Sequence, residues 1–293
     1  MKTKKFWVIG LILVFLLLLA GCAKQPAAPQ QQAPPTPKNP DLILSSTTST
    51  RDTGLLDVLI PQFEAKTGYK VKPIYNGSGA AIALGEKGEA DVLLTHAPSS
   101  EKPDVDNGNF INYQLVMHND FIIVGPPDDP AQIKGIKTDT DAFKKIAAAK
   151  SVFISRGDKS GTNTKELAIW KKAGITPKGS WYQESGTGMG QTLQVASEKK
   201  GYTLTDRGTF LAQQKNIQLA ILMEGDKDLL NIYHVEQVNP QKFSKVNADG
   251  AKAFVDFMVN PDTQKFIADF GKDKYGQPLF YADAGKSVDQ IGK

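Results

Sequence analysis

Two stretches of this sequence combine side chains that could bind an anion. Thr47, Thr48 and Ser49 are three consecutive hydroxyl residues between an apolar strand pattern and a helical pattern. Arg156 follows a second such strand pattern, and the next helical pattern begins after the turn Ser160, Gly161 and Thr162. Unpaired backbone N–H groups converge where a helix starts, and the helix dipole adds about half a positive charge there. With hydroxyls and a guanidinium, these groups are the donors that an oxyanion needs.

A simpler interpretation is that the hydroxyls only cap helices. One Ser or Thr satisfies an N-cap, so the surplus of hydroxyls at residues 47–49 favours binding. Ser78 opens the next helical pattern in the same way, and alone it indicates no more than a cap. Asp52 is interpreted as an acid that complements the dipole at a helix start. Its neighbour Arg51 is given no ligand role.

Gly186, Gly188 and Gly190 alternate in a turn ahead of a helical pattern. A dinucleotide site needs the spacing G-x-G-x-x-G, and a phosphate loop needs Gly-Lys-Ser/Thr; the sequence has neither. We therefore predict a tight turn before a helix, whose N–H groups could still contact a ligand.

Patterns of enzymes and metal sites are scarce. His96, His118 and His234 are the only histidines, none has a metal-ligand spacing, and no G-x-S-x-G motif occurs. We predict no metal cation, no cofactor and no enzymatic activity. A Ser/His/Asp triad stays open, because its members need not be close in sequence. His96, which follows an apolar strand pattern, is predicted to be a hydrogen-bonded structural histidine.

The N-terminus has the pattern of an export signal. Lys2, Lys4 and Lys5 precede the apolar run 6–20, and Leu-Ala-Gly leads to Cys22. A run of about 15 apolar residues falls short of the roughly 20 that span a bilayer. The motif Leu-Ala-Gly-Cys resembles the bacterial lipobox. That resemblance implies a signal peptide over residues 1–21, a lipid on Cys22 and a membrane-anchored, extracytoplasmic protein on the cell surface or in the periplasm.

Charge gives no indication of a nucleic-acid partner. Removing the three lysines of the signal lowers the formal charge from +4 to +1, and no basic cluster or aromatic ladder occurs. Residues 22–39 are rich in Gln, Pro and Ala and are expected to be an extended tether. Cys22 is the only cysteine, so we expect no disulfide within a chain.

The alternation of strand and helix patterns over residues 42–94 predicts parallel strands in an open α/β sheet, and the alternation continues over much of the chain to residue 293. The expected strands are 42–44, 71–75, 90–94, 121–124 and 152–154, and the expected helices are 55–63, 80–84, 141–149, 164–170, 191–199, 253–258 and 266–270. The simplest arrangement has two lobes. Residues 40–120 and 234–293 form the first lobe, residues 121–233 are inserted as the second, and two crossover segments lie near residues 120 and 230. Ligands of such sheets bind where strands end and helices start.

Several motifs in the same order resemble one family. They are the lipobox, Ser46–Thr50, Gly54–Asp57, His96–Pro98, Ser155–Thr162 and Glu184–Gly190. They are similar to the tungstate-binding proteins of bacterial ABC importers, over nearly the whole globular part. This resemblance implies a periplasmic-binding-protein fold of the type II kind, with the ligand in the cleft between the lobes. Its partners would be tungstate or molybdate and an ABC permease with its ATPase, and the protein would be a monomer.

By the same resemblance, the oxyanion is held by Thr47, Thr48, Ser49, Arg156 and the 160–162 turn, with Ser78 beside them. The family's first loop often reads Thr-Thr-Thr-Ser, whereas Ser46 stands first here and keeps the hydroxyl. Phosphate-binding relatives place an acid near His96 that accepts the phosphate proton. No acid stands at that step here, which favours a dianion that has no proton to donate.

Three alternatives remain at this level. A molybdate, sulfate or phosphate binder of the same fold is one, and an exported enzyme that acts on phosphate esters is another. A purely structural surface lipoprotein is the last, and it leaves the hydroxyl loops unexplained. Tungstate and molybdate share charge and shape, so the choice between them depends on the family resemblance alone.

Overall fold

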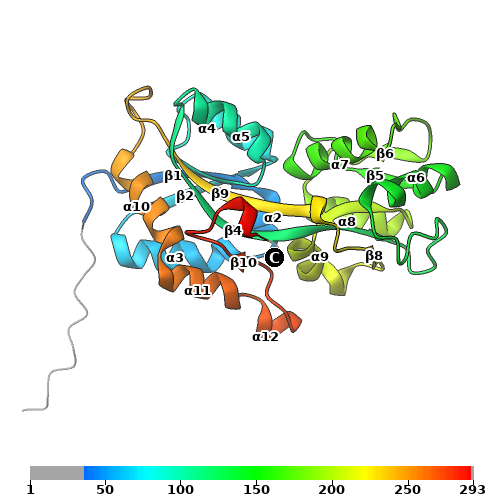
Figure 1. The fold of residues 1–293 in the computed structure, drawn as a ribbon. Helices are drawn as coiled ribbons and strands as arrows, with labels where there is room; N and C mark the ends of the chain where they lie inside the picture. The colour runs from blue at the N-terminus through cyan, green and yellow to red at the C-terminus, as the bar shows by residue number, and fades with distance from the viewer. Residues whose placement is uncertain (1–35, 292–293) are drawn as a thin grey trace, which may run out of the picture. The chain divides into compact units, whose positions relative to one another are not determined.

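A long strand, β4 (Phe110–Gly125), pairs with four of the other strands of the main sheet (Figure 1). A computed structural model describes residues 36–291. The expected signal peptide, Cys22 and most of the expected tether therefore lie outside the described residues. Within residues 36–291, no helix has the length and apolar character needed to cross a membrane.

The first strands of the chain form the predicted parallel α/β unit. β1 (Asp41–Thr47) lies between β2 (Lys70–Asn76) and β3 (Val92–Thr95) and is parallel to both. The helices α4 (Ser78–Glu86) and α5 (Pro98–Asp106) lie on one side of this sheet, and α3 (Leu55–Thr67), α10 (Ala248–Val259) and α11 (Pro261–Asp269) lie on the other (Figure 1). α3 begins after Gly54 and ends at Gly68, which is the predicted stop.

The rest of the main sheet is antiparallel. β9 (Leu230–Val238) pairs antiparallel with both β3 and β4, and β4 also pairs antiparallel with three short strands. These are β7 (Thr203–Asp206), β8 (Ala220–Met223) and β10 (Tyr281–Ala282). The expectation of an α/β fold is confirmed, and so is the parallel pairing expected for the first three strands; the antiparallel pairings were not predicted. Alternating strand and helix patterns identify parallel strands well. Residues 110–120 and 230–238 carry many polar side chains, so the apolar pattern did not predict the strands there.

A smaller unit holds Arg156 and its turn. β5 (Phe153–Ser155) and β6 (Tyr182–Glu184) pair in parallel. The helices of this part of the chain are α6 (Asp139–Ala149), α7 (Gly161–Lys172), α8 (Met189–Glu198) and α9 (Arg207–Gln213). The remaining elements are the short helix α2 (Thr48–Asp52), α12 (Lys272–Tyr275) and the 3-10 turns η1 (Gln214–Asn216), η2 (Lys227–Leu229) and η3 (Val288–Gln290).

Separate apolar clusters fix these units. Phe63 of α3 packs edge-on against Phe254 of α10, with ring centroids 5.2 Å apart. Around β5, the Trp170 ring of α7 lies 4.3 Å from Phe143 and 5.2 Å from Phe153. The described residues form one compact unit by their contacts, so the division into lobes near residues 120 and 233 stays a prediction.

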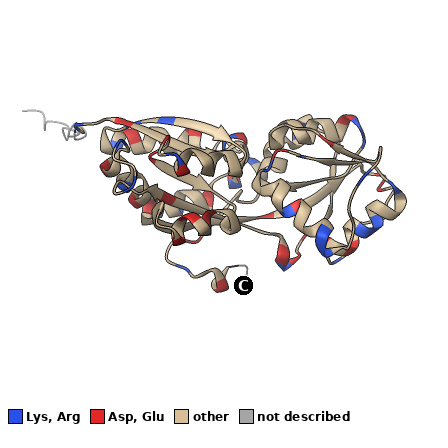
Figure 2. Ribbon diagram, turned by 90° about the horizontal axis from the view of Figure 1, so that it is seen from above, with Lys and Arg blue, Asp and Glu red and all other residues tan. Residues whose placement is uncertain are grey.

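Charged side chains are distributed along the chain without segregation by sign. Lys and Arg are interspersed with Asp and Glu over the helices in Figure 2. Many of these side chains pair locally, as Lys252 does with Asp256 at 2.7 Å and Lys102 with Asp106 at 2.8 Å. Pairs of this exposed kind contribute little to stability.

Helix α7 offers a matched test of this packing. Ile169 is 2% exposed in the cluster around β5, whereas Leu167, two residues earlier on the same helix, is 48% exposed. Ile169→Ala should lower the free energy of unfolding by about 2–5 kcal/mol, because it leaves a cavity. Leu167→Ala should change it by no more than about 0.5 kcal/mol. Urea denaturation of both variants measures the difference, and equal losses would contradict the packing described.

Candidate functional site

Three helices begin directly after strands near the predicted binding residues. α2 follows β1, α4 follows β2, and α7 follows β5 after the turn 156–160. Thr47 caps α2 by accepting the N–H of Thr50 at 3.4 Å, and Ser160 caps α7 by accepting the N–H of Asn163 at 3.2 Å. The interpretation of both hydroxyls as caps is therefore right. It leaves the other N–H groups of each first turn available to a ligand.

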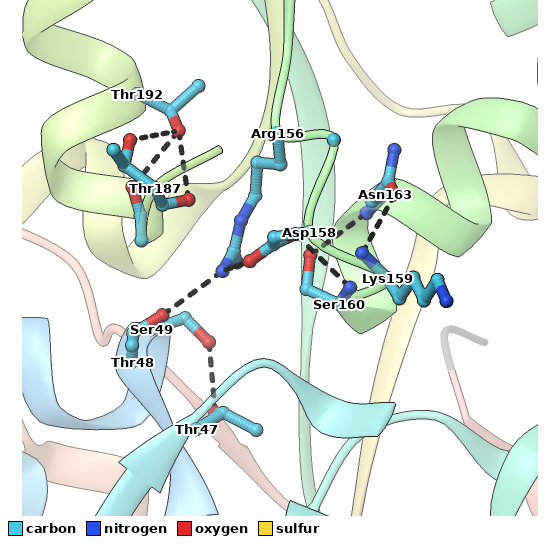
Figure 3. A network of polar contacts seen from close by, with 12 residues as sticks. Thr47, Thr48, Ser49, Arg156, Asp158, Lys159, Ser160, Asn163, Thr187 and Thr192 are labelled. Atoms are coloured by element: carbon cyan, nitrogen blue, oxygen red, sulfur yellow. Dashed lines mark hydrogen bonds and ion pairs between the residues drawn. The ribbon is translucent and has the colours of Figure 1, made fainter. Parts of the chain in front are cut away.

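The structure brings the predicted residues together from distant parts of the chain. Arg156 Nη2 donates to Thr48 Oγ1 at 3.3 Å, across 108 positions of sequence. A Cβ placed on Gly161 would lie 3.0 Å from Ser78 Oγ, so the starts of α7 and α4 approach closely and a side chain at residue 161 would crowd Ser78. Figure 3 shows the extended Arg156 side chain reaching from its turn toward the Thr47–Ser49 loop.

Three buried polar atoms of this cluster have no hydrogen-bond partner among the described residues. They are Ser78 Oγ, Arg156 Nε and Thr162 Oγ1, and the three residues are no more than 2% exposed. A buried donor without a partner costs about 1–3 kcal/mol, so native proteins rarely gather several of them. Only three other buried side-chain atoms within residues 36–291 are in this condition. Their concentration here indicates a place that acceptor oxygens of a ligand would complete.

Asp158 is a member of the site that the sequence analysis missed. Its Oδ2 accepts from Arg156 Nη2 at 2.5 Å, and its Oδ1 accepts the N–H of Ser160 at 3.1 Å. The carboxylate therefore offsets the charge of the guanidinium and shapes the turn. An Asp two residues before a Ser at a helix start is a recognisable turn signal. This spacing predicts that the aspartate accepts a hydrogen bond from a nearby backbone N–H, but it does not predict that the aspartate pairs with the arginine.

Glu166 holds the turn 156–160 in place through hydrogen bonds. This carboxylate is 2% exposed and accepts from Ser155 Oγ at 2.5 Å, from Trp170 Nε1 at 2.8 Å and from Tyr182 Oη at 2.8 Å. Burial raises the pKa of Glu166, and the donors around the carboxylate oppose that rise. Because its partners lie on β5, α7 and β6, Glu166 holds the strand before Arg156 against the helix after it.

His96 is buried and hydrogen-bonded at both ring nitrogens, as predicted. Its Nδ1 lies 2.9 Å from Asn231 Oδ1, and its Nε2 lies 3.2 Å from Ser49 Oγ. Asn231 donates its own amide to Asn119 Oδ1 at 2.8 Å, so its oxygen accepts from His96 Nδ1–H. Nε2 is then an acceptor for the Ser49 hydroxyl. Burial is the main cause that lowers the pKa of His96 to about 4, so the ring is neutral at pH 7.

The loop that carries His96 is held by Glu101 of α5, a helix that the sequence analysis did not predict. Glu101 Oε1 accepts from Thr95 Oγ1 at 2.7 Å and from the N–H of Ala97 at 2.7 Å, and its Oε2 accepts from Tyr113 Oη at 2.8 Å. Burial opposes ionisation, but His234, the Thr95 hydroxyl and the N–H of Ala97 hold the pKa of Glu101 below its usual value.

The glycine-rich turn before α8 has the predicted form. Gly186 has a φ of +64°, and Gly188 is the N-cap of α8. The N–H of Gly190 donates to Asp52 Oδ2 at 3.0 Å. The interpretation of Asp52 as an acid at the start of its own helix is wrong, because Asp52 is the last residue of α2; its carboxylate lies instead at the start of α8.

A separate open pocket of about 300 Å³ adjoins the site. It is lined by His96–Ser99, Phe121, Gly161, Thr164, Lys165, Ala168 and Leu230–Ile232. Its lining includes His96, Ala97, Gly161 and Asn231 of the groups described above, and it contains none of the unpaired donors. Among residues 36–291, no group of three or more His, Cys, Asp or Glu side chains is arranged to bind a metal ion.

Comparison with known proteins identifies the fold. A model described as a PBP superfamily domain matches residues 28–262. The crystal structure of the tungstate ABC transporter from Geobacter sulfurreducens superposes with a TM-score of 0.72 at 48% identity, over 78% of this chain and 98% of that chain. The tungstate-binding protein TupA from Desulfovibrio alaskensis G20 superposes with a TM-score of 0.69 at 45% identity, over 84% of this chain and 99% of that chain.

A curated relative agrees over almost its whole length. The tungstate-binding protein TupA of Peptoclostridium acidaminophilum is 44% identical over 281 residues, which cover 95% of this chain and 98% of that protein. The periplasmic-binding-protein fold that the motifs imply is thereby confirmed. The chain belongs to the PBP superfamily and to the family that contains these tungstate-binding proteins.

Proposed function

We propose that this protein captures tungstate outside the cytoplasm and delivers it to an ABC permease. The observation that carries the proposal is the gathering of the unpaired donors Ser78 Oγ, Arg156 Nε and Thr162 Oγ1 in one buried place. A tetrahedral oxyanion offers several acceptor oxygens at once, so it can satisfy donors that approach from different directions. The relatives named as tungstate-binding proteins support the same ligand.

Fixed dipoles supply most of the positive potential in this proposal. The first turns of α4 and α7 lie against each other, and α2 begins beside them. The backbone N–H groups of all three helix starts would therefore face the anion. The positive charge of Arg156 is offset, because Asp158 pairs with it. The anion is therefore held by oriented N–H and O–H groups, with Arg156 as a directional donor whose Nε is still free to bind.

The neutral state of His96 bears on the choice among oxyanions. Its Nε2 already accepts the Ser49 hydroxyl, so the ring offers the anion no spare acceptor. Asp158 is engaged by Arg156 and the N–H of Ser160. A fully deprotonated dianion such as tungstate or molybdate needs donors only, whereas hydrogen phosphate also needs an acceptor for its proton. We propose Thr47, Thr48, Ser49, Ser78, Arg156, Ser160, Gly161 and Thr162 as the residues around it.

The remaining parts of the proposal depend on the sequence. A lipid on Cys22 and the tether 22–39 would hold a monomeric binding protein near its permease. Binding without chemical turnover is proposed, since donors that surround an anion stabilise its ground state and provide no general base.

Arg156→Ala is the first test of the ligand site. It removes a directional donor and leaves Asp158 as an uncompensated carboxylate, so the affinity for tungstate should fall by at least about 100-fold. Isothermal calorimetry of the purified protein measures the affinity, and circular dichroism verifies that the variant is folded. Lys199→Ala, at an exposed position after α8, is the control and should bind as the natural protein does. Equal affinities of Arg156→Ala and the natural protein would refute the site.

Competition among anions tests the donor-only character of the site. Tungstate and molybdate should displace each other at similar concentrations, whereas phosphate, which carries a proton at pH 7, should need a far higher concentration. Sulfate is also a dianion without a proton, so the donors alone do not exclude it. Displacement titrations with the four sodium salts give the order directly. A preference for phosphate over tungstate would contradict the assigned roles of His96 and Asp158.

The charge state of His96 has a consequence for stability at low pH. The folded pKa is about 4, below the ordinary value of about 6.5, so only the unfolded chain takes up a proton between these values. The contribution of His96 should therefore lower the free energy of unfolding by about 2 kcal/mol as the pH falls from 7 to 5. Urea denaturation at both pH values, compared with His96→Gln, isolates this contribution. If the stability of the natural protein and that of His96→Gln had the same pH dependence, this contribution of His96 would be excluded.

A further inference from the structure

Asp52 makes a contact between two parts of the chain that both border the site. It is the last residue of α2, whose first turn belongs to the proposed site. Its Oδ2 accepts the N–H of Gly190, the second residue of α8, at 3.0 Å and across 138 positions of sequence. α2 continues from β1 of the main sheet, whereas α8 packs beside β5 and β7. The carboxylate thus joins the two segments that carry the Thr47–Ser49 loop and the glycine-rich turn.

The orientation of this carboxylate is fixed from its other side. Asp52 Oδ1 accepts from Arg51 Nε at 3.0 Å and from Arg51 Nη2 at 2.9 Å. The Arg51 guanidinium lies over the Tyr75 ring of β2, 5.9 Å from its centroid. With one oxygen engaged by Arg51, the other oxygen is directed at α8. The Asp52 side chain is only 11% exposed, although Arg51 is half exposed.

Asp52 cannot bind the oxyanion, because its carboxylate is negative and both oxygens accept hydrogen bonds. It meets instead the positive end of a ten-residue helix. A carboxylate at a helix start stabilises that arrangement through the dipole and through a charge-assisted hydrogen bond. The contact therefore strengthens the approach of α2 to α8 without touching the ligand.

We propose that Asp52 is a positioning residue for capture: its bond to the first turn of α8 holds the segments around the anion together. This inference depends on the proposed function, because the closed arrangement is the one that binds tungstate. The apparent affinity of a ligand is its intrinsic affinity multiplied by the fraction of protein in the binding-competent form. Asp52 raises that fraction, so it acts on affinity without contacting the anion.

The close approach of Gly190 provides a second way to disturb the contact. A Cβ at this position would lie 2.9 Å from Asp52 Oδ2 and 3.5 Å from the Gln213 amide nitrogen. Only the first of these distances is too short for a real contact. Gly190→Ala should therefore displace the carboxylate while leaving the helix intact, since alanine is favoured within helices.

A double-mutant cycle tests the proposal. Asp52→Ala should weaken tungstate binding about tenfold, mainly through faster dissociation, and Gly190→Ala should weaken it by a similar factor. In the Asp52→Ala background, Gly190→Ala should have no further effect, because the carboxylate that it displaces is gone. Calorimetry gives the affinities of the four proteins, and stopped-flow displacement by excess molybdate gives the dissociation rates.

The control is Asp57→Ala, five residues away in the first turn of α3. It also removes an acidic side chain, but Asp57 is exposed, and its affinity for tungstate should be that of the natural protein. Asp52→Asn keeps an acceptor and loses the charge, so its affinity should lie between those of the natural protein and Asp52→Ala. Thermal unfolding verifies that all variants are folded.

The outcomes separate this proposal from the proposed function. If the natural protein does not bind tungstate, the proposed function fails. If it binds and Asp52→Ala binds equally well, the role of Asp52 is overturned. The role is also overturned if Gly190→Ala costs the same factor with and without Asp52.

Discussion

The guanidinium of Arg156 is buried, and most of the contacts in the site stabilise that buried charge. An isolated buried charge is prohibitively expensive, so it must be paired and hydrogen-bonded. Asp158 provides the pair at 2.5 Å and Thr48 provides a further acceptor, while Glu166 anchors the strand before the arginine to the helix after it. One nitrogen, Nε, remains without a partner among the described residues. The pairing makes burial tolerable and still leaves a direction in which the arginine can bind.

Much of this arrangement is predictable from the sequence because it depends on local signals. Strand patterns that end in hydroxyl or Ser-Gly-Thr turns place helix starts at the carboxyl ends of strands. The structure has α2 and α4 there after strands of the main sheet, and α7 after a strand of the two-stranded sheet. Gly68 ends α3 as predicted, and the turn before α8 has its predicted form. Each of these features involves residues within one turn of one another, where cap and turn preferences decide the outcome.

The features that escaped prediction depend on side chains brought together by the fold. The pairing of Asp158 with Arg156 and that of Asp52 with Gly190 have no periodic signature. The link from Ser49 through His96 to Asn231 spans residues more than a hundred positions apart, and Asn231 lies on a strand that the apolar pattern did not reveal. Buried polar residues such as Glu101 and Glu166 resemble surface residues in a sequence, because only their partners make burial tolerable.

β4 changes partners between two consecutive residues. Its ladder with β9 extends to Asp120, opposite Leu230, and its ladder with β7 begins at Phe121, opposite Asp206. The peptide between residues 120 and 121 is thus the point at which the backbone hydrogen bonds to β9 end and those to β7 begin. Because the peptide bond itself is planar, any difference in tilt between the two ladders has to come from the φ and ψ angles of residues 120 and 121.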